Sequence, residues 1–193
     1  MNETFSQSFT MKGVLYLMDG KTYRAVRKSS KNTAWEAVSV SGTAYVPTTT
    51  ISAAPTGGGT SYEAVNLLTP KRINTFIGDG TATQFKVDAT DLDETAVTAE
   101  VNGSAVTVSA VNRSTGLVTL AAAPANGNGL ANVSIAFAKT VSGHADKINK
   151  CRFSGLYGGK NDTRVFLSGN PDEPDCDWQS GLYDPTYLSL IHI

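Results

Sequence analysis

The sequence predicts an all-β protein, and three observations support this prediction. Charged residues make up 17 % of the 193 residues, and Thr, Ser, Ala, Gly and Asn take their place, a mix that favours short strands and tight turns. Strong turn signals, among them Asp19-Gly20 and Asn102-Gly103, separate short apolar runs. No helical periodicity continues for more than about two turns.

Residues 1–50 are interpreted as blade-like β hairpins that form part of a scaffold. The apolar run Val14–Met18 is followed by the Asp19-Gly20 turn signal and by an alternating stretch at residues 22–26. This order, an apolar strand, Asp-Gly and a tyrosine-containing strand, is typical of a propeller blade. A further strand is indicated by Trp35, Ala37 and Val38.

Residues 51–71 are predicted to be a Pro/Gly-rich linker. Pro55 and the glycine run at 57–59 mark a connection with unusual backbone angles. A glycine run can cradle phosphate, but this one lacks the Gly-Lys-Ser/Thr ending and a preceding buried strand that such a loop requires. We therefore assign it no nucleotide-binding role.

Residues 72–141 are predicted to form an inserted antiparallel β-sandwich or barrel module. Phe85 and Val87 fall on one face of a strand, and Asn102-Gly103 favours a type I′ hairpin turn. Residues 133–137 place Val133, Ile135 and Phe137 on one face with a period of two. About six short strands with regularly spaced turns are typical of such a module.

Residues 142–187 are interpreted as the same scaffold blade resuming and then being cut short, so that the organisation is nested. The stretch 164–169 reads as a strand, and an aromatic, proline-containing segment follows it. The last six residues, 188–193, resemble the translation of a transposon-type sequencing adapter. We expect them to be an artefact, with the natural chain continuing beyond Tyr187.

The sequence offers little material for catalysis. His144 and His192 are the two histidines, and His192 lies in the expected artefact, which leaves His144 as the one candidate base for a Ser or Cys nucleophile. We interpret His144 as a surface or hinge residue. Carboxylates that could serve glycoside hydrolysis cluster near the C-terminus in a proline-rich loop that carries no sign of a raised pKa: Asp172, Glu173, Asp175, Asp177 and Asp184. We expect no enzyme, no catalytic, cofactor-binding or metal-binding residues, and no cofactor.

The same regions have binding interpretations. The acidic cluster supplies oxygen ligands for calcium, but not with the EF-hand spacing. Three aromatic residues can stack a sugar or pack between blades, and we favour packing: Trp178, Tyr183 and Tyr187. A basic group can contact a partner or simply face solvent, and we favour solvent: Lys21, Arg24, Arg27, Lys28 and Lys31.

The cysteines and the net charge limit the metal-binding and nucleic-acid-binding functions that the chain can have. Cys151 and Cys176 match no metal-binding spacing; they are interpreted as free thiols in a reducing cytoplasm, with one disulfide between them as the alternative. The formal net charge is −1, so that the whole chain lacks the charge of a typical nucleic-acid binder. No apolar run is long enough to span a bilayer, and residues 1–10 lack the pattern of a signal peptide.

Three stretches carry a resemblance to a known class of proteins. They are residues 45–68, with Tyr-Val-Pro-Thr-Thr-Thr-Ile-Ser and Pro-Thr-Gly-Gly-Gly-Thr-Ser-Tyr-Glu-Ala-Val-Asn-Leu-Leu; residues 71–80, Lys-Arg-Ile-Asn-Thr-Phe-Ile-Gly-Asp-Gly; and residues 161–171, Asn-Asp-Thr-Arg-Val-Phe-Leu-Ser-Gly-Asn-Pro, together with Asp177-Trp178 and residues 183–187. The chain resembles, over most of residues 14–187, virion structural proteins of tailed phages and prophages described as packaged-DNA stabilisation, tail hub or nozzle proteins.

The resemblance implies a β-propeller-like scaffold with an inserted β domain, assembled as a homo-oligomeric ring below the portal. Its partners would be portal and tail components, with non-specific contacts to packaged DNA and no membrane. It would assemble in the bacterial host cytoplasm and act without catalysis. The alternative is an adhesin or carbohydrate-binding β module of a phage fibre or cell surface, and a further alternative is a non-catalytic fragment of a glycan depolymerase.

Overall fold

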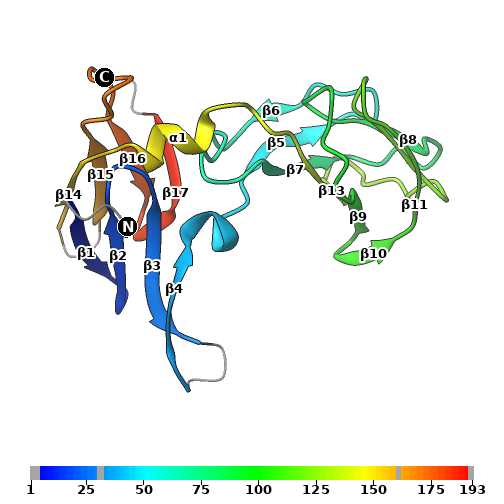
Figure 1. Ribbon diagram of the computed structural model, residues 1–193. Coiled ribbons are helices and arrows are strands. Elements are labelled where there is room, and N and C mark those ends of the chain that lie inside the picture. The colour runs from blue at the N-terminus through cyan, green and yellow to red at the C-terminus, as the bar shows by residue number, and fades with distance from the viewer. Residues whose placement is uncertain (1–4, 30–32, 160–161, 191–193) are drawn as a thin grey trace. The chain divides into compact units, whose positions relative to one another are not determined.

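The computed structural model describes residues 5–29, 33–159 and 162–190, and nearly all of its regular secondary structure is β-strand (Figure 1). Its strands form several antiparallel sheets, with one short α-helix, α1 (His144–Asn149), and one 3-10 turn, η1 (Val40–Thr43). The described residues contain no closed barrel or propeller. The chain divides into two compact units: unit 1 comprises residues 1–45, 66–69 and 142–193, and unit 2 comprises residues 46–65 and 70–141.

Unit 1 contains two four-stranded antiparallel sheets. In each sheet every strand pairs with the next one in sequence, an up-and-down arrangement. The N-terminal sheet consists of β1 (Gln7–Met11), β2 (Val14–Met18), β3 (Tyr23–Lys28) and β4 (Trp35–Ser39). The C-terminal sheet consists of β14 (Phe153–Tyr157), β15 (Arg164–Ser168), β16 (Trp178–Gly181) and β17 (Asp184–Leu190).

The inner faces of the two sheets share one hydrophobic core. Phe9, Tyr16 and Tyr23 stack on the N-terminal sheet, with ring centroids 5.1 to 6.4 Å apart, and the fully buried Trp178 lies in the same cluster. Tyr23 donates its hydroxyl to the Pro185 carbonyl at 3.1 Å, which links the sheets by a buried hydrogen bond. The first strands of the sheets, β1 and β14, are neighbours, and the Ser154 amide donates to Gln7 Oε1 at 2.8 Å.

A four-residue segment, 66–69, contributes to unit 1 between the two stretches of unit 2. Asn66 in this segment is fully buried. Its Nδ2 donates to the carbonyls of Tyr45 at 2.7 Å and Thr186 at 2.8 Å. Its Oδ1 accepts from the amides of Leu68 and Leu188, both at 3.1 Å. One side chain therefore joins three separate parts of the chain, and Leu68 beside it enters the hydrophobic core.

Unit 2 consists of a six-stranded and a three-stranded sheet. The larger sheet has the order β10 (Ser104–Val106), β9 (Thr98–Val101), β13 (Val133–Ala138), β7 (Lys71–Phe76), β5 (Thr48–Ala53) and β6 (Thr60–Ser61), and its β5–β7 pair is parallel. The smaller sheet has the order β11 (Val108–Asn112), β12 (Leu117–Leu120) and β8 (Gln84–Lys86). Both sheets contribute buried residues to a second core, as in a sandwich.

Several local predictions for unit 2 are confirmed. Phe85 and Val87 are both buried in the core, as are Val133, Ile135 and Phe137. Asn102 and Gly103 have positive φ angles of 49° and 76°, which is the type I′ geometry that joins β9 to β10.

The boundaries of unit 2 differ from the predicted ones. Residues 51–71, expected to be a linker, include the second half of β5, which pairs with β7, and residues 66–69, which belong to unit 1. The expected return strand after Asn102-Gly103 is divided: β10 pairs with β9, whereas β11 pairs with β12 in the other sheet. Residues 188–190, assigned to an artefact, lie at the end of β17 with Leu188 buried, and residues 191–193 lie outside the described part of the chain.

Both cysteines are free thiols. Cys151 is buried in the core of unit 1, and its Sγ donates to the Lys147 carbonyl at 3.1 Å. Burial, with smaller contributions from the charges of Asp177 and Glu173, raises the pKa of the Cys151 thiol to about 12. The neutral thiol is therefore the form that the fold favours.

We predict that replacing Asn66 by Ala destabilises unit 1 by about 3 kcal/mol or more, because it leaves buried carbonyl and amide groups without partners. Both tryptophans lie in unit 1, so that tryptophan fluorescence during urea unfolding reports on this unit. The control is Asn149→Ala, a partly exposed asparagine at the end of α1 in the same unit. A loss below about 1 kcal/mol for Asn66→Ala would contradict the role assigned to this side chain.

We also predict that Cys151 reacts with iodoacetamide at pH 8 at least about a hundredfold more slowly than Cys176, because the thiolate is the nucleophile and burial opposes its formation. Since the folded-state pKa lies above the ordinary value of 9.0, the thiol's contribution to stability is complete below pH 9 and is lost as the pH rises toward 12. Peptide mass spectrometry measures both rates in one sample. Equal rates in the folded protein would refute the prediction, and in urea the two should converge.

Candidate functional site

The structure places His144 at the start of α1, where its side chain is half-buried. The described residues contain no group of three or more His, Cys, Asp or Glu side chains arranged to hold a metal ion. In the same part of the chain, no helix is long and apolar enough to cross a membrane.

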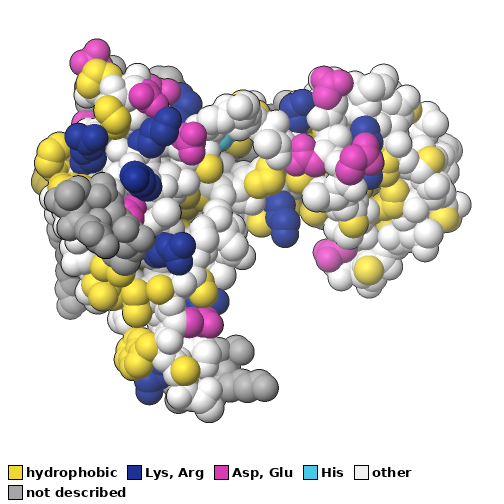
Figure 2. Space-filling view, in the orientation of Figure 1, with side chains coloured by type: hydrophobic (Ala, Val, Ile, Leu, Met, Phe, Trp, Pro, Cys, Tyr) yellow, Lys and Arg dark blue, Asp and Glu magenta, His cyan; other side chains and the backbone are white. Residues whose placement is uncertain are grey.

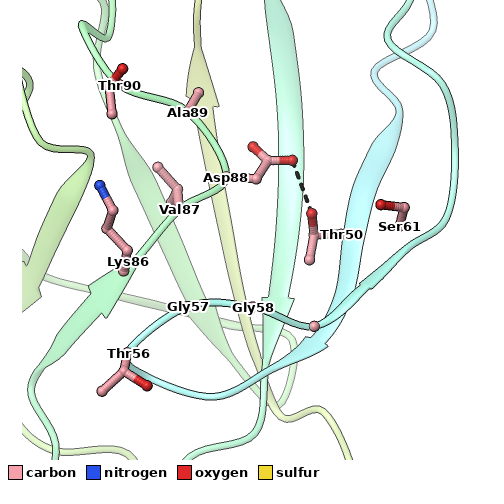
Figure 3. Close-up of a pocket in the computed structure, with 11 residues that line it drawn as sticks. Thr50, Thr56, Gly57, Gly58, Ser61, Lys86, Val87, Asp88, Ala89 and Thr90 are labelled. Atoms are coloured by element: carbon pink, nitrogen blue, oxygen red, sulfur yellow. Dashed lines mark hydrogen bonds between the residues drawn. The ribbon is translucent and has the colours of Figure 1, made fainter.

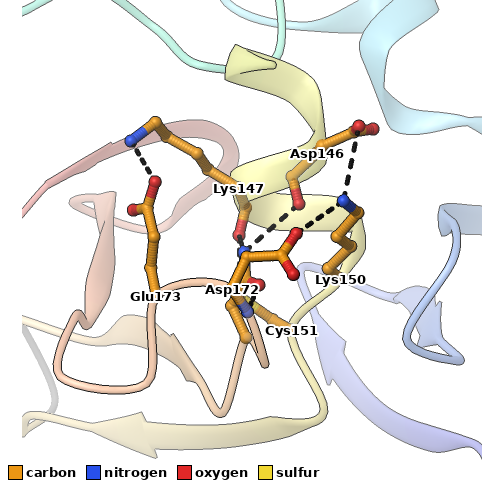
Figure 4. A network of polar contacts seen from close by, with 7 residues as sticks. Asp146, Lys147, Lys150, Cys151, Asp172 and Glu173 are labelled. Carbon is orange, nitrogen blue, oxygen red and sulfur yellow. Dashed lines mark hydrogen bonds and ion pairs between the residues drawn. The ribbon is translucent and has the colours of Figure 1, made fainter.

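Two carboxylates of the acidic cluster hold the loop after β15 against α1 (Figure 4). Lys147 Nζ lies 2.5 Å from Glu173 Oε1, and Lys150 Nζ lies 2.6 Å from Asp172 Oδ2. The hydrogen bond and charge of Asp172 raise the pKa of Lys150. Asn170, which is buried in the same loop, donates to the Lys147 carbonyl at 3.0 Å. These contacts fix α1 to the C-terminal sheet. Asp172 and Glu173, two of the five clustered acids, thus have a structural role as ion-pair partners of α1.

The other acids and the predicted aromatic residues do not form a common site. Asp184 Oδ1 accepts from the amide and hydroxyl of Thr186 at 2.9 and 2.6 Å, while Asp175 and Asp177 are exposed. The three aromatic residues occupy separate environments: Trp178 is fully buried in the core, Tyr183 donates to the Gly159 carbonyl at 3.2 Å, and Tyr187 packs on Tyr45 with ring centroids 5.3 Å apart.

The outer face of the N-terminal sheet combines apolar and cationic side chains. Strand register places Leu15, Val26 and Ala37 in one row across it, and Lys28 opposite Trp35 in another. Arg24 lies on this face opposite Leu17. We call the seven residues the N-terminal outer face: Leu15, Leu17, Arg24, Val26, Lys28, Trp35 and Ala37. Figure 2 shows cationic and hydrophobic side chains side by side on the visible part of unit 1.

The remaining members of the predicted basic group lie elsewhere. Arg27 points to the other face and pairs with Glu36 at 3.1 Å. Lys21 is exposed in the turn between β2 and β3, and Lys31 lies outside the described residues. The described members of the predicted basic group therefore lie on the outer face (Arg24 and Lys28), on the inner face (Arg27) and in a turn (Lys21).

The outer face of the C-terminal sheet carries three aromatic rings. Phe153, Gly155 and Tyr157 lie on one side of the edge strand β14, with Phe166 opposite Gly155 and Arg164 opposite Tyr157 on β15. Arg164 Nε lies 3.5 Å from Asp162 Oδ1, and the Phe5 ring packs edge-on against Phe153 with 6.4 Å between ring centroids. Phe153 is 55 % exposed and Tyr157 77 % exposed. We call Phe153, Gly155, Tyr157 and Phe166 the C-terminal outer face. Sequence reasoning missed this group, although the alternation of two aromatic residues around Gly155 was a signal for it.

A polar pocket of about 460 Å³ lies in unit 2, between the glycine turn at 57–59 and the strand that ends with Lys86 (Figure 3). Thr50 and Ser61 line it from one side, and Lys86 and Asp88 from the other. The three glycines have φ angles of 103°, 81° and 92°. A side chain at Gly59 would collide with the Ile51 carbonyl at 2.7 Å, so that the turn can approach β5 this closely because it lacks side chains.

A hydrogen-bonded group of side chains orients Asp88 at this pocket. Its Oδ2 accepts from the hydroxyls of Thr49 at 2.6 Å and Thr50 at 2.9 Å. Asn74, which is buried, donates to Thr49 Oγ1 at 2.9 Å and accepts from the Asp88 amide at 2.8 Å. The Asp88 carboxylate is held in this way, and the Lys86 ammonium and the hydroxyls of Thr50 and Ser61 line the same pocket. This set of groups is suited to hydrogen-bonding a ligand that carries several hydroxyl groups. No sequence signal joined these residues, because they come from three separate segments.

Comparisons of the chain with protein-family models, with curated proteins and with solved structures find no match.

Proposed function

We propose that the chain is a structural component of a tailed-phage virion, at the head–tail connector or tail hub, and that it acts by assembly without catalysis. The observation that carries this proposal is the presence, on both sheets of unit 1, of an outer face with exposed apolar side chains: Leu15 and Trp35 on one, and Phe153 and Tyr157 on the other. Such surfaces mark places where other protein surfaces bind.

The arrangement of unit 1 supports the blade interpretation of this scaffold. Two four-stranded up-and-down sheets share a core through their inner faces, and their first strands lie next to each other. Adjacent blades of a propeller have this arrangement. Blade-like units bury their remaining faces against neighbours, which is consistent with a homo-oligomeric ring that contacts portal and tail proteins. The virion setting itself rests on the sequence resemblance over residues 14–187.

The same proposal accounts for the inserted unit and for the charge distribution. Unit 2 has its own core, so that it can form an appendage on the scaffold. Lys12 and Lys21, exposed in the turns that precede and follow β2, supply cations for non-specific contacts with DNA phosphates. The proposed setting is the virion, assembled in the cytoplasm of the bacterial host.

We predict that antibodies raised against the purified chain label the head–tail junction of tailed particles from a host that carries this gene. Immunogold electron microscopy measures the position of the label, and particles from a host without the gene serve as control. Intact tailed particles without label, in a lysate where the antibody detects the soluble chain, would refute the proposal.

The polar pocket of unit 2 favours a second candidate function, carbohydrate binding. Asp88 is oriented there by two threonine hydroxyls, and carboxylates that accept hydrogen bonds from sugar hydroxyls provide orientation in such sites.

We predict for this candidate that a glycan array detects binding by the wild-type chain, and that Asp88→Asn lowers it about tenfold by weakening charge-assisted hydrogen bonds. The control is Glu100→Gln, an exposed acid on β9 of the same unit. Thermal unfolding checks that both variants fold. Absence of binding by the wild-type chain, or equal binding by the two variants, would exclude this function for the pocket.

A further inference from the structure

We propose that copies of the chain associate head to tail through the two outer faces of unit 1, with the N-terminal outer face of one copy covering the C-terminal outer face of the next. This inference rests on the proposed function in assembly and names the surfaces that assemble. The occupant of each face is therefore a second copy of this chain.

The C-terminal outer face leaves open space above Gly155, flanked by aromatic residues. Phe153 and Tyr157 project from β14 on either side of Gly155, where a Cβ atom would meet nothing within 4 Å. Phe166 lies opposite Gly155, and its ring centroid is 6.2 Å from that of Tyr157, edge to face. A cation or a large apolar side chain that entered above Gly155 would therefore contact ring faces and edges.

The N-terminal outer face carries the matching side chains. Leu15 and Trp35 are 36 % and 68 % exposed, and Lys28 Nζ lies 5.9 Å from the centre of the Trp35 ring. This face thus already contains one cation–aromatic contact at its edge. Arg24 lies on the same face. The acidic residue of β4, Glu36, points to the other side of the sheet, where it lies opposite Arg27.

The chemistry of the two faces favours a head-to-tail pairing. Two N-terminal outer faces placed together would bring Arg24 and Lys28 of both copies against each other, and like charges in contact are unfavourable. An N-terminal face on a C-terminal face instead places these cations on three aromatic rings, which is a cation–π arrangement. Arg164 on that face is already paired with Asp162 at 3.5 Å. A contact between two different surfaces of the same molecule produces either a closed ring or a growing filament.

The size of the faces indicates that a single contact is weak. Strands of about five residues in a four-stranded sheet span about 17 Å by 19 Å, or roughly 300 Å² of sheet plane, whereas a stable interface buries about 800 Å² on each partner. We therefore expect association to depend steeply on concentration and to become strong when a ring closes and each copy makes two contacts.

The test is sedimentation velocity of the full chain at concentrations from about 10 to about 500 µM, a range chosen for a small interface. The wild-type chain should form species larger than a dimer as the concentration rises. Two variants each remove one face: Arg24→Glu with Lys28→Glu, and Phe153→Ser with Tyr157→Ser. Each alone should require at least about tenfold more protein to associate, the loss of about one good contact.

Mixing the two variants decides whether the contact is head to tail. An equimolar mixture retains one intact face on each variant, so that it should form a 1:1 dimer that does not grow. A control variant, Tyr62→Ser, removes an aromatic residue of unit 2 that is 66 % exposed and should associate like the wild-type chain. Far-ultraviolet circular dichroism and thermal unfolding verify that each variant is folded.

Three outcomes would overturn the inference: a wild-type chain that stays monomeric throughout, folded variants that all associate like the wild type, or a mixture that forms no heterodimer. These failures are distinct from failure of the proposed function. Gold label at the head–tail junction together with a monomeric chain would refute the interface alone, and an assembling chain on unlabelled particles would refute the virion function alone.

Discussion

The four hydrogen bonds of Asn66 are the constraint on which the order of unit 1 depends. The chain leaves this unit after Tyr45, returns for residues 66–69, and leaves again until residue 142. A segment of four residues can bury little apolar surface, and this one contributes Leu68 to the core. Asn66 fixes the position of this segment, because its side-chain amide is hydrogen-bonded to the carbonyls of Tyr45 and Thr186 and to the amide of Leu188. A buried amide whose groups are all paired selects one register of these segments over others.

That register determines which surfaces remain uncovered. With β17 fixed beside residues 66–68, Leu188 and Trp178 face the N-terminal sheet and fill one core with Tyr16 and Tyr23. Because successive side chains of a strand point to opposite faces, the same register turns Phe153 and Tyr157 outward on β14. The exposed rings are thus a geometric consequence of how the inner faces are matched. Contiguous exposed apolar patches often mark surfaces that bind a partner.

Sequence reasoning recovered the parts of the fold that local patterns encode and missed the parts that distant segments create. The hairpin with Asp19-Gly20 and the turn at Asn102-Gly103 were predictable, because positive φ angles and alternation are local properties. Strand β5 was not, since its threonines lie between Pro47 and Pro55 and its partner, β7, is parallel. The pocket around Asp88 was equally invisible, because Thr50, Asn74 and Asp88 meet through tertiary structure. Of the candidate site residues, Trp178 was correctly favoured for packing, whereas Phe153 and Tyr157 were not singled out.

The polar groups of unit 1 with shifted pKa values hold its elements together. In the acidic loop, Asp172 pairs with Lys150 and Glu173 pairs with Lys147, and these ion pairs fix the position of α1. The buried thiol of Cys151 has its pKa raised to about 12, the opposite direction from that of a reactive cysteine, which is lowered by nearby positive charge. Catalytic groups have pKa values shifted toward the working pH. In unit 1 the interactions that shift pKa values instead hold elements together, and the surface that they support is apolar, aromatic and cationic, which suits recognition of another protein surface.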